Sequence, residues 1–188
     1  MRRLLQLFAV LAILAMFGCS TPPPASGPNP EHVATSLRFI QNIGGGDMAY
    51  EAFLSGMEDL ETEQPGMAAL AERAFAGTTA DDFARIAAPI YARHLSHEHL
   101  AELERYTRSP AIQRFFSLIY MSVKAGEAPN KGELMKQFSA DELTEIIKFS
   151  RSPSVAAMKQ SQPQINREFY KAGREWAEVR FNEYMDQQ

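Results

Sequence analysis

A segment of this sequence occurs twice, and the duplication constrains the fold more than any other feature. Residues 95–112 and 138–155 align without a gap at an offset of 43, with six identical and seven conservative positions of 18. A match of this length in one register indicates that the chain contains the same local structure twice. The six identical pairs are Ser96/Ser139, Leu100/Leu143, Glu102/Glu145, Arg108/Arg151, Ser109/Ser152 and Pro110/Pro153.

Each copy predicts a helix, a corner and a second helix. Ser96 and Ser139 can accept a backbone N–H at a helix start, and Glu142 can complete a capping box with Ser139. Both copies then reach the tripeptide Arg-Ser-Pro, at 108–110 and 151–153. Its serine can cap the next helix, its proline suits the first helical turn, and the residue before a proline avoids the helical conformation. We expect a structural corner whose arginine meets the last carbonyls of the preceding helix.

Apolar residues recur at steps of three and four in much of the chain, which is the spacing of amphipathic helices. No stretch shows the sustained alternation of apolar and polar residues that is typical of strands. We therefore predict an all-α fold, an irregular multi-helix bundle of about nine helices that contains the two duplicated pairs. The clearest apolar stripes are Ile112, Phe115, Phe116, Ile119 and Val123, and Ile165, Phe169, Ala172, Trp176 and Val179.

Caps and prolines predict the helix boundaries. A first helix is expected to open at Asn29-Pro30, to bury Val33, Leu37 and Ile40, and to end at Gly44–Gly46. The other predicted features are an N-cap at Asp47, a short Ala-rich helix after Pro65, a capping box of Thr79 and Asp82, and bends at Pro89 and Pro163.

The N-terminal region predicts export and a lipid anchor. Two arginines precede an apolar run over residues 4–17, which is typical of a secretory signal and shorter than the roughly 20 residues of a membrane span. Gly18 and Cys19 end that run and resemble the lipoprotein box of bacteria, in which the cysteine receives lipid and becomes the new N-terminus. The alternative is a signal cleaved elsewhere, which leaves Cys19 without a role.

These features divide the chain into three parts. We expect a lipoprotein signal peptide at 1–18, a Pro-rich tether at 19–30 and a single helical domain at 31–188, with repeat-like segments at 91–125 and 134–183. In lipoproteins of this kind, a non-acidic residue after the cysteine permits sorting to the outer membrane, and Ser20 fits this rule. The expected location is therefore the bacterial cell envelope, with the domain facing the periplasm.

The first copy also resembles a family of bacterial exported proteins that is known only as a domain of unknown function. The family signature is Y-x-x-x-[FL]-[ST]-x-x-E-[LI] followed by F-Y-x-S-P-x-G-x-K. The first copy matches it at Tyr91, Leu95, Ser96, Leu100, Tyr106, Ser109, Pro110 and Arg114, and departs from it at His99 and Ile112. The second copy matches at Phe138, Ser139, Glu142, Leu143, Phe149, Ser152 and Pro153, and departs at Val155 and Ala157. The resemblance implies an exported all-helical protein and no particular catalytic residue.

Composition excludes several classes of protein. The chain has 19 basic and 23 acidic residues, a net charge of −4, which argues against a nucleic-acid partner because phosphates need a basic face. A single cysteine excludes a disulfide framework and a cysteine-based zinc module. The chain has no P-loop and no G-x-S-x-G motif. We therefore predict no cofactor, no metal and no enzymatic activity.

His94, His97 and His99 are the densest group of potential metal ligands in the sequence. They flank the helix start expected at Ser96, and residues two apart do not share a helix face. The zinc motif H-E-x-x-H would need a histidine at position 101, which is Ala101. We interpret the three histidines as surface residues at a helix start.

Three further groups each have a functional and a structural interpretation. Gly44–Gly46 could form an anion-binding nest, but a flexible loop is favoured. Ser109 and Ser152 are interpreted as caps rather than nucleophiles, because no histidine stands at a matching place in both copies. The acidic run at 58–63 is interpreted as a solvated helix face.

The anchor, the tether and the duplicated scaffold favour a non-catalytic lipoprotein that binds a protein or another component of the envelope. It would be attached to the membrane through lipidated Cys19. The alternative is a binder of a lipid or another apolar small ligand between helices, where bundle pockets commonly form. The candidate contacts, in a groove expected between the repeats, are Tyr91, Tyr106, Phe149 and Trp176.

Overall fold

The computed structural model describes residues 28–125 and 130–187. Every regular element in these two ranges is an α-helix, which confirms the predicted all-α bundle of about nine helices. The predicted signal peptide, Cys19 and most of the predicted tether lie outside the described residues. The helices are α2 (Pro30–Asn42), α3 (Gly45–Glu63), α4 (Pro65–Ala74), α5 (Ala80–His94), α6 (His97–Thr107), α7 (Pro110–Lys124), α8 (Lys131–Met135), α9 (Ala140–Ser150) and α10 (Pro153–Met185).

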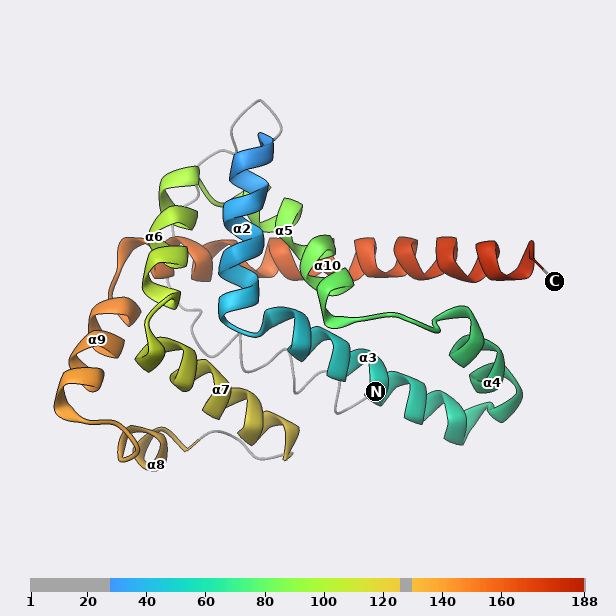
Figure 1. Cartoon of the computed structure of the whole chain (residues 1–188), viewed down its shortest axis with the longest axis horizontal. Helices are drawn as coiled ribbons and strands as arrows, with labels where there is room; N and C mark the ends of the chain where they lie inside the picture. The colour runs from blue at the N-terminus through green and yellow to red at the C-terminus, as the bar shows by residue number, and fades with distance from the viewer. Residues whose placement is uncertain (1–27, 126–129, 188) are drawn as a thin grey trace.

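Helices α2, α5 and α6 form the centre of the fold. α2 packs against both α5 and α6, and α10 runs along the length of the molecule and contacts α4, α5 and α6 (Figure 1). α3 and α4 extend toward one end, and α7, α8 and α9 lie toward the other (Figure 1). The side chains buried most completely between these helices include Phe39, Ile90, Leu100, Leu103 and Ile112.

The two copies of the duplicated segment form equivalent helix pairs, α6–α7 and α9–α10. Ser96 and Ser139 are the N-caps of the first helices, and Ser109 and Ser152 are the N-caps of the second. In all four caps the serine hydroxyl accepts a backbone N–H, as predicted. The core positions correspond as well, because both members of the pairs Leu103/Ile146 and Ile112/Val155 are buried.

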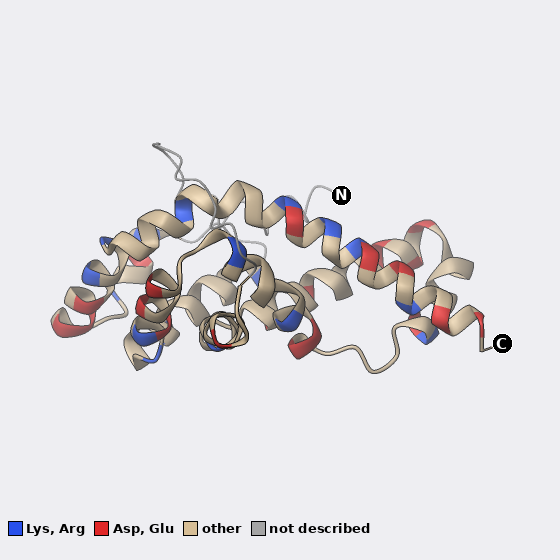
Figure 2. Ribbon diagram, turned by 90° about the horizontal axis from the view of Figure 1, so that it is seen from above, with Lys and Arg blue, Asp and Glu red and all other residues tan. Residues whose placement is uncertain are grey.

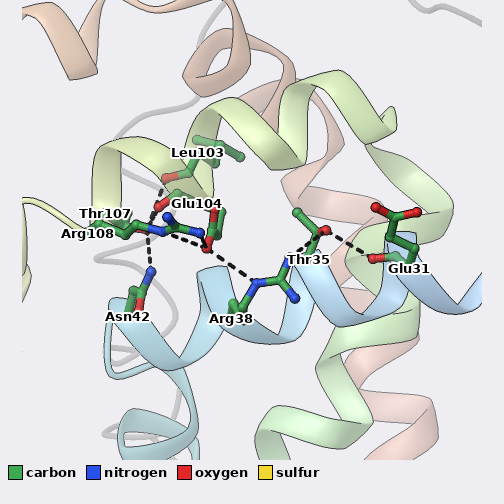
Figure 3. Close-up of polar contacts among 8 residues, drawn as sticks. All are labelled: Glu31, Thr35, Arg38, Asn42, Leu103, Glu104, Thr107 and Arg108. Carbon is green, nitrogen blue, oxygen red and sulfur yellow. Dashed lines mark hydrogen bonds and ion pairs between the residues drawn. The ribbon is translucent and has the colours of Figure 1, made fainter.

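The Arg-Ser-Pro corner differs from the prediction at its first arginine. Arg108 Nη2 lies 2.6 Å from Oε1 of Glu104, and Nε of Arg38 in α2 lies 3.3 Å from the same oxygen (Figure 3). Arg108 therefore meets a buried carboxylate rather than the helix carbonyls, because a charge-assisted hydrogen bond is stronger than a neutral one. The second copy has Ile147 in place of Glu104, and Arg151 there is exposed.

The prediction that Asp47 caps the second helix is wrong. α3 begins at Gly45, its N-cap is Gly44, and Asp47 lies in its first turn. Gly44 has φ 67°, a left-handed conformation that glycine adopts without steric cost. A Cβ on Gly46 would lie 2.4 Å from the carbonyl oxygen of Ala80, so glycine here allows α3 to approach the start of α5. The glycine run is a tight connection rather than the flexible loop that we expected.

The first helix begins as predicted, but its buried face differs. The Asn29 side chain accepts the backbone N–H of His32 at 2.8 Å and so caps the helix. Ile40 is buried, whereas Val33 and Leu37 are half-buried at the edge of the core. The buried face therefore includes polar residues that periodicity did not indicate. Its members are His32, Thr35, Ser36, Phe39 and Ile40.

The prolines inside α5 and α10 do not end these helices. Pro89 lies within α5 and Pro163 within α10, which is 33 residues long. Figure 2 shows α10 bent into an arch over the other helices, consistent with the loss of a backbone hydrogen bond at an internal proline. The predicted capping box at the start of α5 is confirmed, since the Thr79 N–H donates to Asp82 at 2.8 Å.

Candidate functional site

An open cleft lies where the end of α2, the start of α3 and one side of α7 meet. Its volume is about 490 Å³, which falls within the range of small-molecule sites. Most of its lining side chains are polar, and they come from three helices of different parts of the sequence. The lining residues are Gln41, Asn42, Ile43, Gly44, Asp47, Gln113, Ser117 and Tyr120.

The α2 side of the cleft carries two amide groups with a fixed orientation. Asn42 Nδ2 donates to Thr107 Oγ1 at 3.3 Å, and Gln41 Nε2 donates to Asp81 Oδ1 at 3.0 Å. Thr107 is fully buried and donates in turn to the Leu103 carbonyl, so α6 holds Asn42 in place (Figure 3). Each amide uses one N–H within the protein, so its second N–H and its carbonyl oxygen remain able to bond a ligand.

The α7 side of the cleft carries Gln113 and Ser117, which lie one turn apart and are both exposed. Within the described parts of the chain, neither side chain makes a hydrogen bond to another residue. An amide and a hydroxyl each donate and accept hydrogen bonds, so these two side chains can bind a ligand in either role.

The third part of the lining is Tyr120, which lies beside an ion pair. Lys124 Nζ is 2.7 Å from Oε1 of Glu51, and the hydrogen bond from Lys124 lowers the pKa of the Glu51 carboxyl below its ordinary value of 4.5. Burial, together with the charge of Glu51, raises the pKa of Tyr120 above 10.0. The phenol therefore stays protonated at neutral pH. Among the lining residues, Asp47 alone carries a formal charge.

The four residues expected to line a groove between the repeats do not lie together. Tyr106 and Phe149 are in contact, with ring centroids 5.7 Å apart, and Phe116 packs on Phe149 at 5.9 Å. These rings fill the space between the two copies. Tyr91 is buried against Phe39, and burial raises the pKa of its phenol. The structure therefore shows packing at these three positions, where we expected a groove.

Trp176, the fourth of these residues, lies in a separate aromatic cluster near the outer end of α10. Its ring centroid is 5.7 Å from Phe75, 5.6 Å from Phe83 and 6.5 Å from Phe53. Phe75 also lines a second, mostly apolar crevice of about 410 Å³ between the end of α4 and α10. Its lining residues are Phe75, Ala177, Glu178, Phe181 and Asn182.

The three histidines of the predicted group point to different partners. His94 Nε2 lies 2.7 Å from Oε1 of Glu168, and Arg93 Nη2 lies 2.6 Å from the other oxygen of this carboxylate. The ring of His97 packs edge-on against the ring of His32 at 5.4 Å. Within residues 28–125 and 130–187, no three histidine, cysteine or acidic side chains are arranged to hold a metal ion.

His99 takes part in a polar contact that the sequence did not indicate. Its Nδ1 lies 3.1 Å from Oγ of Ser154, and the Ser154 hydroxyl donates to Glu102. The hydroxyl stands between the imidazole and the carboxylate, whereas a nucleophilic triad places the imidazole in the middle. Ser154 is also fully buried, so a substrate would not reach it. The three side chains connect α6 to the start of α10.

The cleft itself was not predicted from the sequence. The one signal near it was Gly44–Gly46, for which an anion-binding nest was the functional alternative to the favoured flexible loop. The Asp47 carboxylate lies close to Gly44, 3.7 Å from where a Cβ would stand, and would repel an anion there. Gln113 and Ser117 stand on the polar side of α7, where sequence periodicity indicates only exposure to solvent.

Comparison with protein-family models, with curated proteins and with solved structures found no match for this chain. In the part of the chain that the structure describes, none of the helices combines the length and the apolar character that crossing a membrane requires. Function is therefore inferred from the cleft and the crevice.

Proposed function

We propose that the protein is a lipid-anchored lipoprotein of the bacterial cell envelope that acts by binding rather than by catalysis. The cleft between α2, α3 and α7 binds a component of the envelope. The observation that carries this proposal is the set of polar residues from three helices in the lining of this cleft. Membership of the exported helical family that residues 91–115 resemble is part of the same proposal.

The cleft is suited to binding because the protein holds its walls in position. Gly44 and Gly46 set the close connection from α2 to α3, and the Ser109 cap fixes the start of α7. Asn42 is held by Thr107 of α6. Because the Asn42 amide is already oriented, it loses little conformational entropy when a ligand binds.

The side chains that could in principle take part in catalysis also favour a binding function, because they are engaged in contacts between helices. Ser154 is buried between His99 and Glu102, and Glu168 is held by Arg93 and His94. These groups connect helices to one another. They lie outside the lining of the cleft, where a reacting ligand would be held.

Lipid attachment at Cys19 would place this cleft close to a membrane. The ten residues from Ser20 to Asn29 include four prolines, and an extended Pro-rich segment spans about 3.1 Å per residue. The tether would therefore keep the helical domain within roughly 30 Å of the anchor. Several acyl chains make such an attachment effectively permanent.

Retention of the protein on isolated envelopes tests the two parts of the proposal separately. The Cys19→Ala variant removes the anchor, and we expect it to leave the membrane fraction while a share remains bound to the insoluble envelope. Adding Gln113→Ala and Ser117→Ala should lower that share several-fold. Gln164→Ala, an exposed glutamine of α10 outside the cleft, is the matched control and should not change it. Equal retention of the cleft and control variants would contradict binding through the cleft.

A second candidate function is supported by the apolar crevice between α4 and α10. Its volume of about 410 Å³ and the phenylalanines Phe75 and Phe181 in its lining fit an apolar chain. Trp176, the single tryptophan of the sequence, packs on Phe75 and reports on this crevice. Titration with oleate should change the tryptophan fluorescence of the full chain if the crevice binds acyl chains, and Phe181→Glu should abolish the change. An unchanged emission would exclude this function.

A further inference from the structure

The chemistry of the cleft lining indicates what kind of ligand it binds. Gln41 and Asn42 each bond one amide N–H to Asp81 or Thr107, which leaves the second N–H and the carbonyl oxygen of each for a ligand. Gln113 and Ser117 offer both donors and acceptors. A ligand that satisfies this lining must itself carry several groups that both donate and accept hydrogen bonds. Hydroxyl groups have this property, whereas carboxylates, phosphates and ammonium groups do not.

Negatively charged ligands are disfavoured at this position. Asp47 lies in the lining and brings a formal negative charge. The cleft lies between the C-terminal end of α2, whose last carbonyls carry partial negative charge, and the N-terminal end of α3, whose partial positive charge Asp47 in the first turn offsets. Lys124 is the nearby cation, but Glu51 holds it at 2.7 Å outside the lining.

Metal ions and simple ammonium ligands fit less well than neutral ones. Among the described residues no group of three acidic, histidine or cysteine side chains is placed to hold a cation. A cation also offers no acceptor to the donor groups of Gln113 and Ser117, whereas a hydroxyl does.

Tyr120 adds an apolar surface to this polar lining. Its ring is half-buried in the wall of the cleft, and its phenol keeps its proton because burial and Glu51 raise its pKa. Tyrosine commonly presents an apolar ring and a polar tip to one ligand. A sugar ring matches such a wall, since its C–H groups face an aromatic ring while its hydroxyls reach the amides.

We propose that this cleft is a binding site for a neutral carbohydrate, held by the amides of Asn42 and Gln113, the hydroxyl of Ser117 and the ring of Tyr120. This inference rests on the proposed function and names the class of envelope component. A cleft of about 490 Å³ accommodates a mono- or disaccharide unit of a longer glycan.

Three sugars that share one ring and differ in charge test the proposal. Glucose, glucosamine and glucuronate are titrated into the ¹⁵N-labelled full chain, and amide chemical shifts are followed by NMR. We expect glucose to shift the signals of Gly44, Gln113 and Ser117 with a millimolar Kd. Glucuronate should bind at least tenfold more weakly than glucose, and glucosamine no more tightly than glucose.

Substitutions then locate the binding. Gln113→Ala should weaken glucose binding at least fivefold, and Gln164→Ala should leave it unchanged. Asp47→Asn should bring the affinity for glucuronate closer to the affinity for glucose. Because Gln113 and Asp47 are exposed, the folded spectrum of each variant serves as its own control.

Three results would overturn the carbohydrate assignment. They are tighter binding of glucosamine than of glucose, tighter binding of glucuronate, and no shift at Gly44, Gln113 or Ser117 with any of the sugars. None of these results bears on envelope retention, which tests binding through the cleft without naming the ligand. Failure of the inference is thus distinguishable from failure of the proposed function.

Discussion

Tyr106 and Phe149 occupy the same position in the two copies of the duplicated segment, and their rings pack against each other. Their centroids are 5.7 Å apart and the ring planes meet at 62°, an edge-to-face arrangement. The copies are therefore joined through equivalent residues, in addition to sharing helix boundaries. This contact fills the space between the repeats, which is why we propose ligand binding at the cleft formed with α2 and α3 instead.

Truncation of Phe149 should be among the most destabilising single substitutions in the chain. Phe149 is 4% exposed and contacts both Tyr106 and Phe116. Phe149→Ala is expected to lower the free energy of unfolding by about 3–5 kcal/mol, because it leaves a cavity in the core. Urea unfolding measures this change. Ile147→Ala, two residues away and 44% exposed, is the control, and equal losses at the two positions would contradict the packing described here.

The serine caps at the Arg-Ser-Pro corners should stabilise the second helix of each pair. Ser109 accepts the N–H of Ala111 and Ser152 accepts the N–H of Val155, both at 3.2 Å. Replacement of either serine by alanine should cost about 1 kcal/mol. The loss should be larger at Ser152, which is buried. Thermal unfolding of both variants is the measurement, and no loss at either site would show that these serines are not caps.

Glu104 should contribute more to stability than an exposed acidic residue. Its buried carboxylate accepts hydrogen bonds from Arg108 and Arg38 and so connects α6 to α2 (Figure 3). Glu104→Ala should lower the free energy of unfolding by about 2 kcal/mol, because hydrogen bonds to a charged group are lost and both arginines lose their carboxylate, although Arg38 keeps its contact with Thr35.

The matched control for Glu104 is the exposed ion pair of Glu133 and Lys136, whose nitrogen and oxygen lie 2.7 Å apart. Glu133→Ala should change the free energy of unfolding by less than about 0.5 kcal/mol, since exposed pairs contribute little. Chemical denaturation of both variants compares them directly. A larger loss for Glu133→Ala than for Glu104→Ala would refute the role given to the buried carboxylate.

The pH dependence of stability should reveal the contact between α5 and α10. Burial opposes ionisation of Glu168, but its hydrogen bonds with Arg93 and His94 outweigh this effect and lower its pKa below 4.5. A lowered folded-state pKa stabilises the fold above the unfolded value near 4.5, and that stabilisation is lost as the pH falls through the folded-state pKa.

We therefore expect Glu168→Gln to be less stable than the original chain at pH 7, by a margin that shrinks as the pH falls below 4.5. Urea unfolding at a series of pH values from 7 downward measures the difference. A difference that stays constant over the whole range would show that ionisation of Glu168 does not contribute.

Much of the fold could be predicted because its signals are local. The four serine caps and the prolines at helix starts act over three or four residues, so they can be recognised in the sequence. The error at Asp47 has a tertiary cause. The close approach of Gly46 to Ala80 decides where α3 begins, and it depends on how α3 packs against α5.

The cleft could not be predicted because its parts are distant in the sequence. Asn42 and Ser117 stand on different helices, and only the packing of those helices brings them to one cleft. For the same reason Trp176 and Tyr106, which we expected to line the same groove, belong to different aromatic clusters. Periodicity shows which face of a helix is apolar, but not which helix will cover it.

The central claim is that the cleft is the recognition surface of the protein in the envelope. A photoreactive p-benzoylphenylalanine at position 117 in living cells tests it most directly, with the same residue at position 164 as control. We predict several-fold more crosslinked product from position 117 than from 164, and loss of that excess in the Gln113→Ala background. Equal yields at the two positions, or a yield from position 117 that Gln113→Ala leaves unchanged, would contradict the claim.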